Sequence, residues 1–225
     1  MEIRYHGHAF FEIEAENGTQ ILIDPFTEGN NWNDVTPDDF DPDVVAVTHG
    51  HFDHVAEAHE FDATVIAQPE VAGYLGKQGH EDSVGMNVGG SYEHDGVEFQ
   101  MTKAFHSSGT PGEADFDGYG GTPAGYVIDD GETSFYHAGD TALFGDMEKV
   151  IGGVYDPDVA AVPIGDHFTM GIDEAAVAVD WLGVETAIPI HYDTFPPIQQ
   201  NPDEFAEKVD DAEVEILDAG EGIRA

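Results

Sequence analysis

A short segment after the apolar run 44–47 carries four potential metal ligands. His49, His51, Asp53 and His54 occur within six residues. Left uncoordinated, such a cluster would be costly, because burial desolvates imidazoles and protonated imidazoles repel one another. Zinc, iron and manganese all accept imidazole and carboxylate ligands. In an extended loop His49 and His51 would point the same way, whereas Asp53 and His54 would point elsewhere and suit a second metal.

This spacing resembles the H-x-H-x-D-H signature of the metallo-β-lactamase superfamily. The match runs from His49 to His54, with Gly50 and Phe52 at the two variable positions. Over nearly its whole length the chain also resembles the uncharacterised metal-dependent hydrolases called UPF0173. The segments that carry this likeness are 4–8 (RYHGH), 22–26 (LIDPF), 136–141 (YHAGDT), 163–170 (PIGDHFTM) and 191–197 (HYDTFPP).

The resemblance implies an α+β fold, a four-layer αββα sandwich, with residues 1–225 forming a single hydrolase domain. It also implies three later ligands, His106, Asp140 and His191, each at the end of a strand. The implied ligand set is one metal on His49, His51 and His106, a second on Asp53, His54 and His191, and Asp140 as the bridge between them.

The activity implied by the resemblance is metal-dependent hydrolysis. A hydroxide held between two divalent ions would attack a small ester, lactone, amide or phosphodiester. Zinc is the expected metal, with manganese, iron and nickel as alternatives. Asp53 would orient the hydroxide and pass a proton to the leaving group, and His167 is expected to line the catalytic pocket. Two alternatives stay open, an RNase Z type nuclease and a non-catalytic metal-binding protein, because the ligands do not define the substrate.

Three further residues, His8, Asp24 and His137, are expected beside the metals. Strand ends crowd around such a site, so these side chains would contact substrate or hydrogen-bond the metal ligands. For His137, two residues before Asp140, a satisfied structural hydrogen bond is an equal alternative. Asp24 closes the apolar run 21–23 and is expected to orient a ligand histidine. The rim of the pocket is expected to be shaped by the segment 194–197.

Short β-branched runs between Gly and Asp turns predict the strands that position these residues. Alternation of these runs with helical segments predicts a layered fold, and a faint likeness between its halves suggests that they are related. Helices are predicted at 69–77, where Pro69 suits the first turn, at about 175–182, and from Asn201 onward. The predicted strands are 10–13, 21–23, 44–47, 64–67, 97–101, 126–128, 133–136, 158–163 and 186–189.

Acidic residues dominate the charge of the chain, with 47 Asp and Glu against 6 Lys and Arg and a formal net charge of -41. The basic residues are scattered, which argues against nucleic acid as a partner and favours a small-molecule substrate. The acids are spread along the whole chain, as on the surface of a halophilic protein, so the fold is expected to need high salt. The chain has no cysteine, which excludes disulfides and thiolate metal sites.

Targeting signals are not evident in the sequence. The start, Met1 to His6, lacks a basic region followed by an apolar stretch. No apolar run approaches the roughly 18–20 residues that a membrane span needs. These features predict a soluble cytoplasmic protein that does not engage a membrane. No apolar stripe indicates its oligomeric state.

Overall fold

The computed structural model describes residues 1–112 and 118–225 and contains two seven-stranded sheets. In order across the first sheet lie β16 (Gly222–Arg224), β1 (Glu2–Tyr5), β2 (Phe11–Glu14), β3 (Gln20–Ile23), β4 (Val44–Ala46), β5 (Thr64–Ala67) and β6 (Ser83–Gly85). The second sheet has the order β15 (Glu213–Val214), β14 (Thr186–Ile190), β13 (Val159–Pro163), β12 (Ser134–His137), β11 (Ala124–Asp129), β8 (Val97–Lys103) and β7 (Ser91–His94). The short strands β9 (Gly109–Thr110) and β10 (Gly118–Tyr119) pair separately.

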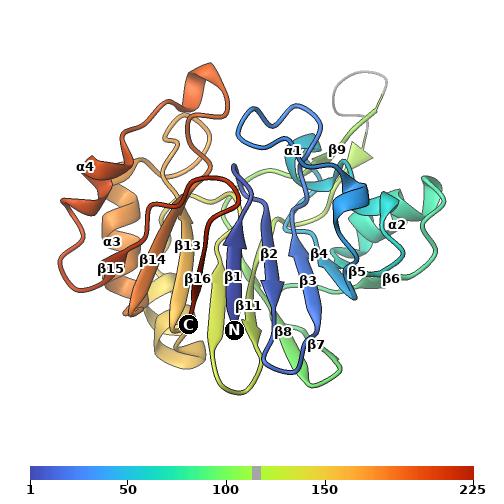
Figure 1. The fold of residues 1–225 in the computed structure, drawn as a ribbon, viewed down its shortest axis with the longest axis horizontal. Helices are drawn as coiled ribbons and strands as arrows, with labels where there is room; N and C mark the ends of the chain where they lie inside the picture. The colour runs from blue at the N-terminus through green and yellow to red at the C-terminus, as the bar shows by residue number, and fades with distance from the viewer. Residues whose placement is uncertain (113–117) are drawn as a thin grey trace.

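Helices cover the outer face of each sheet, as Figure 1 shows. The segments α1 (Phe52–Val55), η2 (Ala58–Glu60) and α2 (Pro69–Lys77) pack on the first sheet. The π-helix η3 (Met147–Tyr155), α3 (Ile172–Leu182) and α4 (Pro202–Ala206) pack on the second. Two short 3-10 turns, η1 (Pro37–Asp39) and η4 (Pro196–Ile198), lie in loops. The expected four-layer αββα sandwich is therefore confirmed.

Burial on both faces explains the continuous apolar runs of the sequence. In β4, Val44 and Ala46 face the core between the sheets, whereas Val45 faces the helices. A strand covered on both faces needs no polar side chains, so its sequence does not alternate. The helix predicted at 69–77 has the expected bounds, and every predicted strand overlaps an observed one. The structure adds β1, β7, the strand β16 that pairs with β1, and the π-helix.

The direction of the strands brings the candidate residues to one edge. In the first sheet β1, β3, β4 and β5 run the same way, because β2 pairs antiparallel with both β1 and β3 and the later pairs are parallel. In the second sheet β8, β12, β13 and β14 share a direction for the same reason. Both halves thus repeat one topology, as expected. Ligands of layered α/β folds bind at the carboxyl ends of such strands.

Candidate metal centre

Each candidate ligand follows the carboxyl end of a strand in this set. The segment 49–54 follows β4 and enters α1, and it brings the rings of His49 and His54 together, with centroids 4.1 Å apart. Gly50 permits this path, because a Cβ there would lie 3.2 Å from the carbonyl oxygen of Gly109. His106 follows β8, Asp140 follows β12 and His191 follows β14.

Three histidines form the first group of ligand atoms. One ring nitrogen each from His49, His51 and His106 lies within 4.8 Å of the others. Nε2 of His49 is 2.9 Å from Nδ1 of His51. His49 is buried, whereas His51 and His106 are half-buried and line a cavity. The structure thus brings together the three residues that the resemblance assigns to one metal.

A second group contains Asp53, His54, His191 and also His8, whose ligand atoms lie within 4.8 Å of one another. Oδ2 of Asp53 is 3.9 Å from Nε2 of His54 and 4.0 Å from Nε2 of His191. The first three are the residues that the resemblance assigns to the other metal. His8 was expected beside the site, and the structure places its imidazole within this group.

Asp140 lies between the two groups. Its Oδ2 is 3.1 Å from Nε2 of His191 and 3.5 Å from Nε2 of His106, and its Oδ1 is 3.5 Å from Nε2 of His54. The carboxylate is therefore in reach of ligands from both groups. Gly139, directly before it, has a φ of 61°, a left-handed conformation that glycine adopts without strain.

Several buried ligand atoms have no hydrogen-bond partner among the described residues. They are Nε2 of His54, Oδ1 of Asp140 and both ring nitrogens of His191. Buried polar atoms are normally satisfied, and leaving one unpaired costs about 1–3 kcal/mol. Imidazole nitrogens and carboxylate oxygens suit zinc, iron and manganese. The donor set and its unpaired atoms therefore fit a metal site, and this His/Asp cluster can bind metal.

Asp24 orients two of the histidines. Its Oδ1 accepts the Thr48 amide at 2.7 Å, and its Oδ2 accepts Nδ1–H of His54 at 2.7 Å and the Thr48 hydroxyl at 2.5 Å. Because the Thr48 hydroxyl donates to Asp24, it accepts from Nδ1–H of His49, which lies 3.1 Å away. The neutral form of each histidine therefore carries its proton on Nδ1 and presents Nε2 to the centre, as a metal ligand requires.

Opposing charges shift the protonation of the cluster in the absence of metal. Burial lowers the pKa of His54, but the carboxylates of Asp140, Asp24 and Asp53 outweigh it and hold that pKa well above its usual value. Burial, with the adjacent His54, holds the pKa of His49 well below the ordinary range. The same two causes lower the pKa of His51 to about 4. Metal binding would therefore displace few protons, chiefly the one on His54.

His8 contacts a residue 45 positions away. Its Nε2 is 3.0 Å from Oδ2 of Asp53, and its Nδ1 is 3.0 Å from Oγ1 of Thr194. Burial, together with His191, lowers the pKa of His8 to about 4. It adopts a left-handed backbone conformation with a φ of 62°, and it follows Gly7 at 93°.

The other two candidate histidines lie apart from the ligand groups. His137 is buried in β12, where its Nε2 donates to the carbonyl of Ala9 at 2.9 Å and its Nδ1 accepts the Gly139 amide at 3.1 Å. Both ring nitrogens are satisfied, so this residue ties β12 to the loop after β1. His167 is exposed and lies against Phe168, with ring centroids 4.6 Å apart, and only Phe168 lines the cavity at the site. The catalytic role of His167 stays a prediction.

A cavity of about 670 Å³ opens onto the ligand groups. Small-molecule sites usually occupy about 300–1,000 Å³, so its size suits a compact substrate. The ligand residues form one part of its wall, and aromatic side chains from α1 and from two loops form another. The lining residues are His51, Phe52, Asp53, His106, Ser107, Ser108, Gly109, Asp140, Phe168, His191, Phe195 and Pro197.

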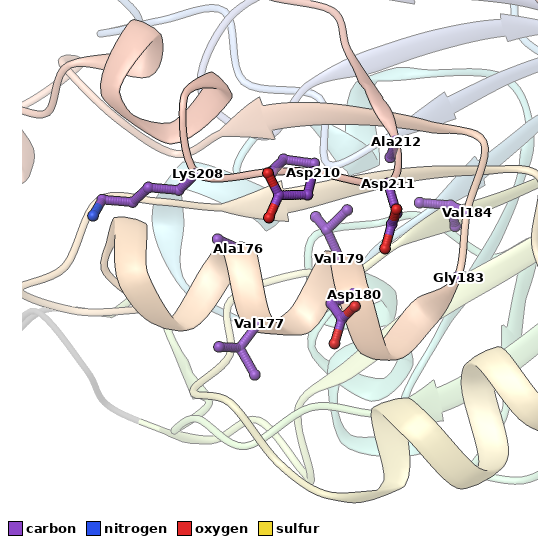
Figure 2. Close-up of a pocket in the computed structure, with 11 residues that line it drawn as sticks. Ala176, Val177, Val179, Asp180, Gly183, Val184, Lys208, Asp210, Asp211 and Ala212 are labelled. Carbon is purple, nitrogen blue, oxygen red and sulfur yellow. The ribbon is translucent and has the colours of Figure 1, made fainter.

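A second cavity, of about 480 Å³, lies between α3 and the segment 208–212 (Figure 2). Aliphatic side chains and aspartates line it among the described residues, together with Lys208. Figure 2 shows that Lys208 extends away from the other labelled side chains, and its Nζ pairs with Asp173 at 3.0 Å. This cavity contains none of the histidines of the site, so we assign the chemistry to the cavity at the sheet edge.

Comparison with known proteins agrees with this geometry. A family profile described as "Beta-lactamase superfamily domain" matches residues 19–192. The fold and the His/Asp cluster thus define a metal-dependent hydrolase of the metallo-β-lactamase superfamily. A UPF0173 metal-dependent hydrolase of Methanopyrus kandleri is 48% identical over 98% of each chain, and one of Halobacterium salinarum is 44% identical over 99% of this chain and 98% of its own. The chain belongs to the UPF0173 metal-dependent hydrolases.

Solved structures show the same fold. Igni18, described as a novel metallo hydrolase from Ignicoccus hospitalis, has a TM-score of 0.87 and 36% identity, covering 99% of this chain and 97% of its own. A putative metal-dependent hydrolase from Parabacteroides distasonis has a TM-score of 0.72 at 23% identity, covering 96% and 92%. No helix in the described parts of the chain is long and apolar enough to cross a membrane.

Proposed function

We propose that residues 1–225 form one hydrolase domain that uses two divalent metal ions, with zinc as the first candidate. His49, His51 and His106 would hold one ion, and Asp53, His54 and His191 the other. Asp140 would contact both. When bound, such ions lower the pKa of water, so that it can act as a nucleophile near neutral pH, and they polarise the scissile bond.

The remaining chemistry falls to Asp53. Burial raises the pKa of its carboxyl, but His54 and His8 outweigh burial and keep that pKa below its ordinary value. Asp53 is therefore ionised at neutral pH and can accept a proton from the attacking water and pass it to the leaving group. The contact with Nε2 of His8, at 3.0 Å, leaves its second carboxylate oxygen for this role.

The observation that carries this proposal is the position of Asp140, whose two oxygens lie 3.1–3.5 Å from ligand nitrogens of both groups. The test is elemental analysis of the protein purified in molar salt. We expect two equivalents of metal in the wild type and about one in His51→Ala. His94→Ala, which changes a histidine of β7 outside the cluster, should retain both. Retention of both ions by His51→Ala would contradict the ligand assignment.

Activity is then measured on carboxylic esters, lactones, amides, β-lactams and phosphodiesters. We expect hydrolysis of at least one class, and its loss in His51→Ala but not in His94→Ala. Two bound ions without turnover of any of them would favour a non-catalytic metal-binding protein instead. Cleavage of structured RNA would favour the nuclease alternative.

A further inference from the structure

We propose that the substrate is an uncharged carboxylic ester or lactone with an apolar group next to the scissile bond. This inference deepens the proposed hydrolase function and rests on it. Three observations carry it: the aromatic wall of the cavity at the site, the exposure of that wall, and the position of every cation in the chain.

The wall opposite the ligands is made of Phe52, Phe168, Phe195 and Pro197. Phe52 and Phe195 lie with ring centroids 6.1 Å apart, and Phe195 also lies 5.3 Å from the ring of His8. The aromatic surface thus extends from the mouth of the cavity to the second ligand group. A substrate whose reacting bond lies at the ligands would place its neighbouring groups on these rings.

Two of these rings are exposed. Phe52 is 48% exposed and Phe168 is 51% exposed, and both line the cavity at the site. Exposed apolar patches commonly mark binding sites, because covering them with an apolar ligand removes them from water. Each buried CH₂ group contributes about 0.8 kcal/mol, which corresponds to about fourfold in affinity.

Away from the metal ligands, no basic side chain is available to bind a charged group of the substrate. The structure describes all six basic residues, and none lines this cavity. Four of them have acidic partners elsewhere. Arg4 pairs with Glu2 and Glu12, Lys103 with Asp146, Lys208 with Asp173, and Arg224 with Glu16.

These features select against charge of either sign beyond the reacting bond. An anionic group on the aromatic wall would lose its hydration without gaining a partner. A cationic group could contact the aromatic faces, but two bound divalent ions beside them would offset Asp53 and Asp140 and repel it. The phosphate of a phosphodiester would add a negative charge at the reacting bond, which bound metal ions can offset, but it would also bring a strongly hydrated group beside the aromatic wall without gaining a partner there. We therefore favour neutral esters and lactones over phosphodiesters.

The test measures binding separately from catalysis. Calorimetry with metal-loaded protein compares two unreactive ketones, 2-butanone and 2-octanone, and the ω-sulfonate and ω-trimethylammonium derivatives of 2-octanone. We expect 2-octanone to bind at least about tenfold more tightly than 2-butanone and than either charged derivative. Equal affinities for both ketones, or tighter binding of a charged derivative, would overturn the inference.

A charge introduced at the wall provides a sharper test. Phe168→Lys places a cation at the mouth of the cavity and should strengthen binding of the ω-sulfonate at least tenfold while weakening that of 2-octanone. Val154→Lys is the matched control, because it makes the same change of net charge at an exposed position of η3. If both variants strengthen sulfonate binding equally, the effect is due to overall charge and the assignment of the wall is wrong.

Turnover separates this inference from the proposed function. We expect kcat/KM for p-nitrophenyl hexanoate to exceed that for the acetate at least about tenfold. Hydrolysis of both esters at equal rates would overturn the apolar preference and leave the hydrolase function intact. Hydrolysis of phosphodiesters with no hydrolysis of esters would also overturn the inference and leave that function intact. Preferential binding of 2-octanone without turnover of any ester, lactone, amide, β-lactam or phosphodiester would count against the hydrolase function and leave the apolar preference intact.

Discussion

Replacement of Asp24 by Asn tests how the protein prepares its histidines for metal. Asp24 accepts hydrogen bonds from the Thr48 amide, the Thr48 hydroxyl and Nδ1–H of His54. Asn has the same shape but only one oxygen. With that oxygen on the Thr48 amide, its NH₂ group would face two donors. His54 would then relieve the conflict by moving its proton to Nε2, the atom that faces the metal site.

The expected loss comes from this change of tautomer. Removing such a partner of a ligand histidine typically reduces metal affinity 10–100-fold, or about 1.4–2.7 kcal/mol. Backbone strain adds little, because Asp24 has a φ of 47° and Asn tolerates the left-handed region as well as Asp does. The effect therefore reports on the hydrogen bonds of Asp24.

The assay is competition for zinc with a chromophoric chelator in molar salt, measured for wild type, Asp24→Asn and Asp156→Asn. Asp156 is a matched control, since it has a φ of 48° at the exposed end of η3 and lies outside the ligand groups. We expect weaker zinc binding in Asp24→Asn alone. Zinc affinity equal to that of the wild type in Asp24→Asn would refute the argument that Asp24 sets the tautomer of His54.

Three further outcomes are expected. Gly139→Ala should destabilise the protein by at least about 1 kcal/mol more than Gly131→Ala, measured by urea unfolding. Both glycines have a positive φ, but only at Gly139 would a Cβ lie 2.5 Å from a carbonyl oxygen, that of Ala124. Circular dichroism should show loss of the fold at about 10 mM salt, where the Debye length is about 30 Å and the net charge of -41 is poorly screened; an unchanged spectrum would count against a salt-adapted surface. Without metal, stability to urea should fall as the pH drops from about 6.5 toward 4. A histidine whose pKa is lowered in the folded protein takes up its proton first in the unfolded chain, which favours unfolding. A constant urea midpoint would contradict this. The raised pKa of His54 opposes this trend, but it is outnumbered by the lowered pKa values of His8, His49, His51, His106 and His137.

Local patterns were sufficient for a layered fold and for the buried strands and helices that were predicted, whereas the four-layer arrangement came from the resemblance. The start of the helix at 69–77 could be predicted from Pro69, which suits a first turn, and its end only approximately. The buried strands β4 and β13 could be predicted from uninterrupted apolar runs. The strand β16 could not, because three residues near the C-terminus pair with β1 more than 200 positions away, and no local pattern encodes that contact.

Some residues of the candidate site could likewise be predicted from local sequence, and others could not. The cluster at 49–54 was evident from composition and spacing alone, whereas the resemblance was needed to select His106, Asp140 and His191 from the twelve histidines and many acids of the chain. The placement of His8 against Asp53 depends on how two loops meet and could not be read from either segment. Phe195 was expected at the rim, but Phe52 and Phe168 gave no signal, because a phenylalanine that lines a cavity has the same sequence pattern as one in a core.

The backbone at this sheet edge shows that the site was not shaped by stability alone. His8, Asp24 and His191 have φ values of 62°, 47° and 54°, and the left-handed region costs a non-glycine residue about 1–2 kcal/mol. Glycine would relieve that cost at each position, yet each carries a side chain that reaches the ligand groups. Strained residues of this kind persist where the surrounding structure holds them and function needs them. Hydrogen bonds stabilise these conformations here. Asp24 accepts from His54, and the His191 amide donates to the His8 carbonyl at 2.7 Å.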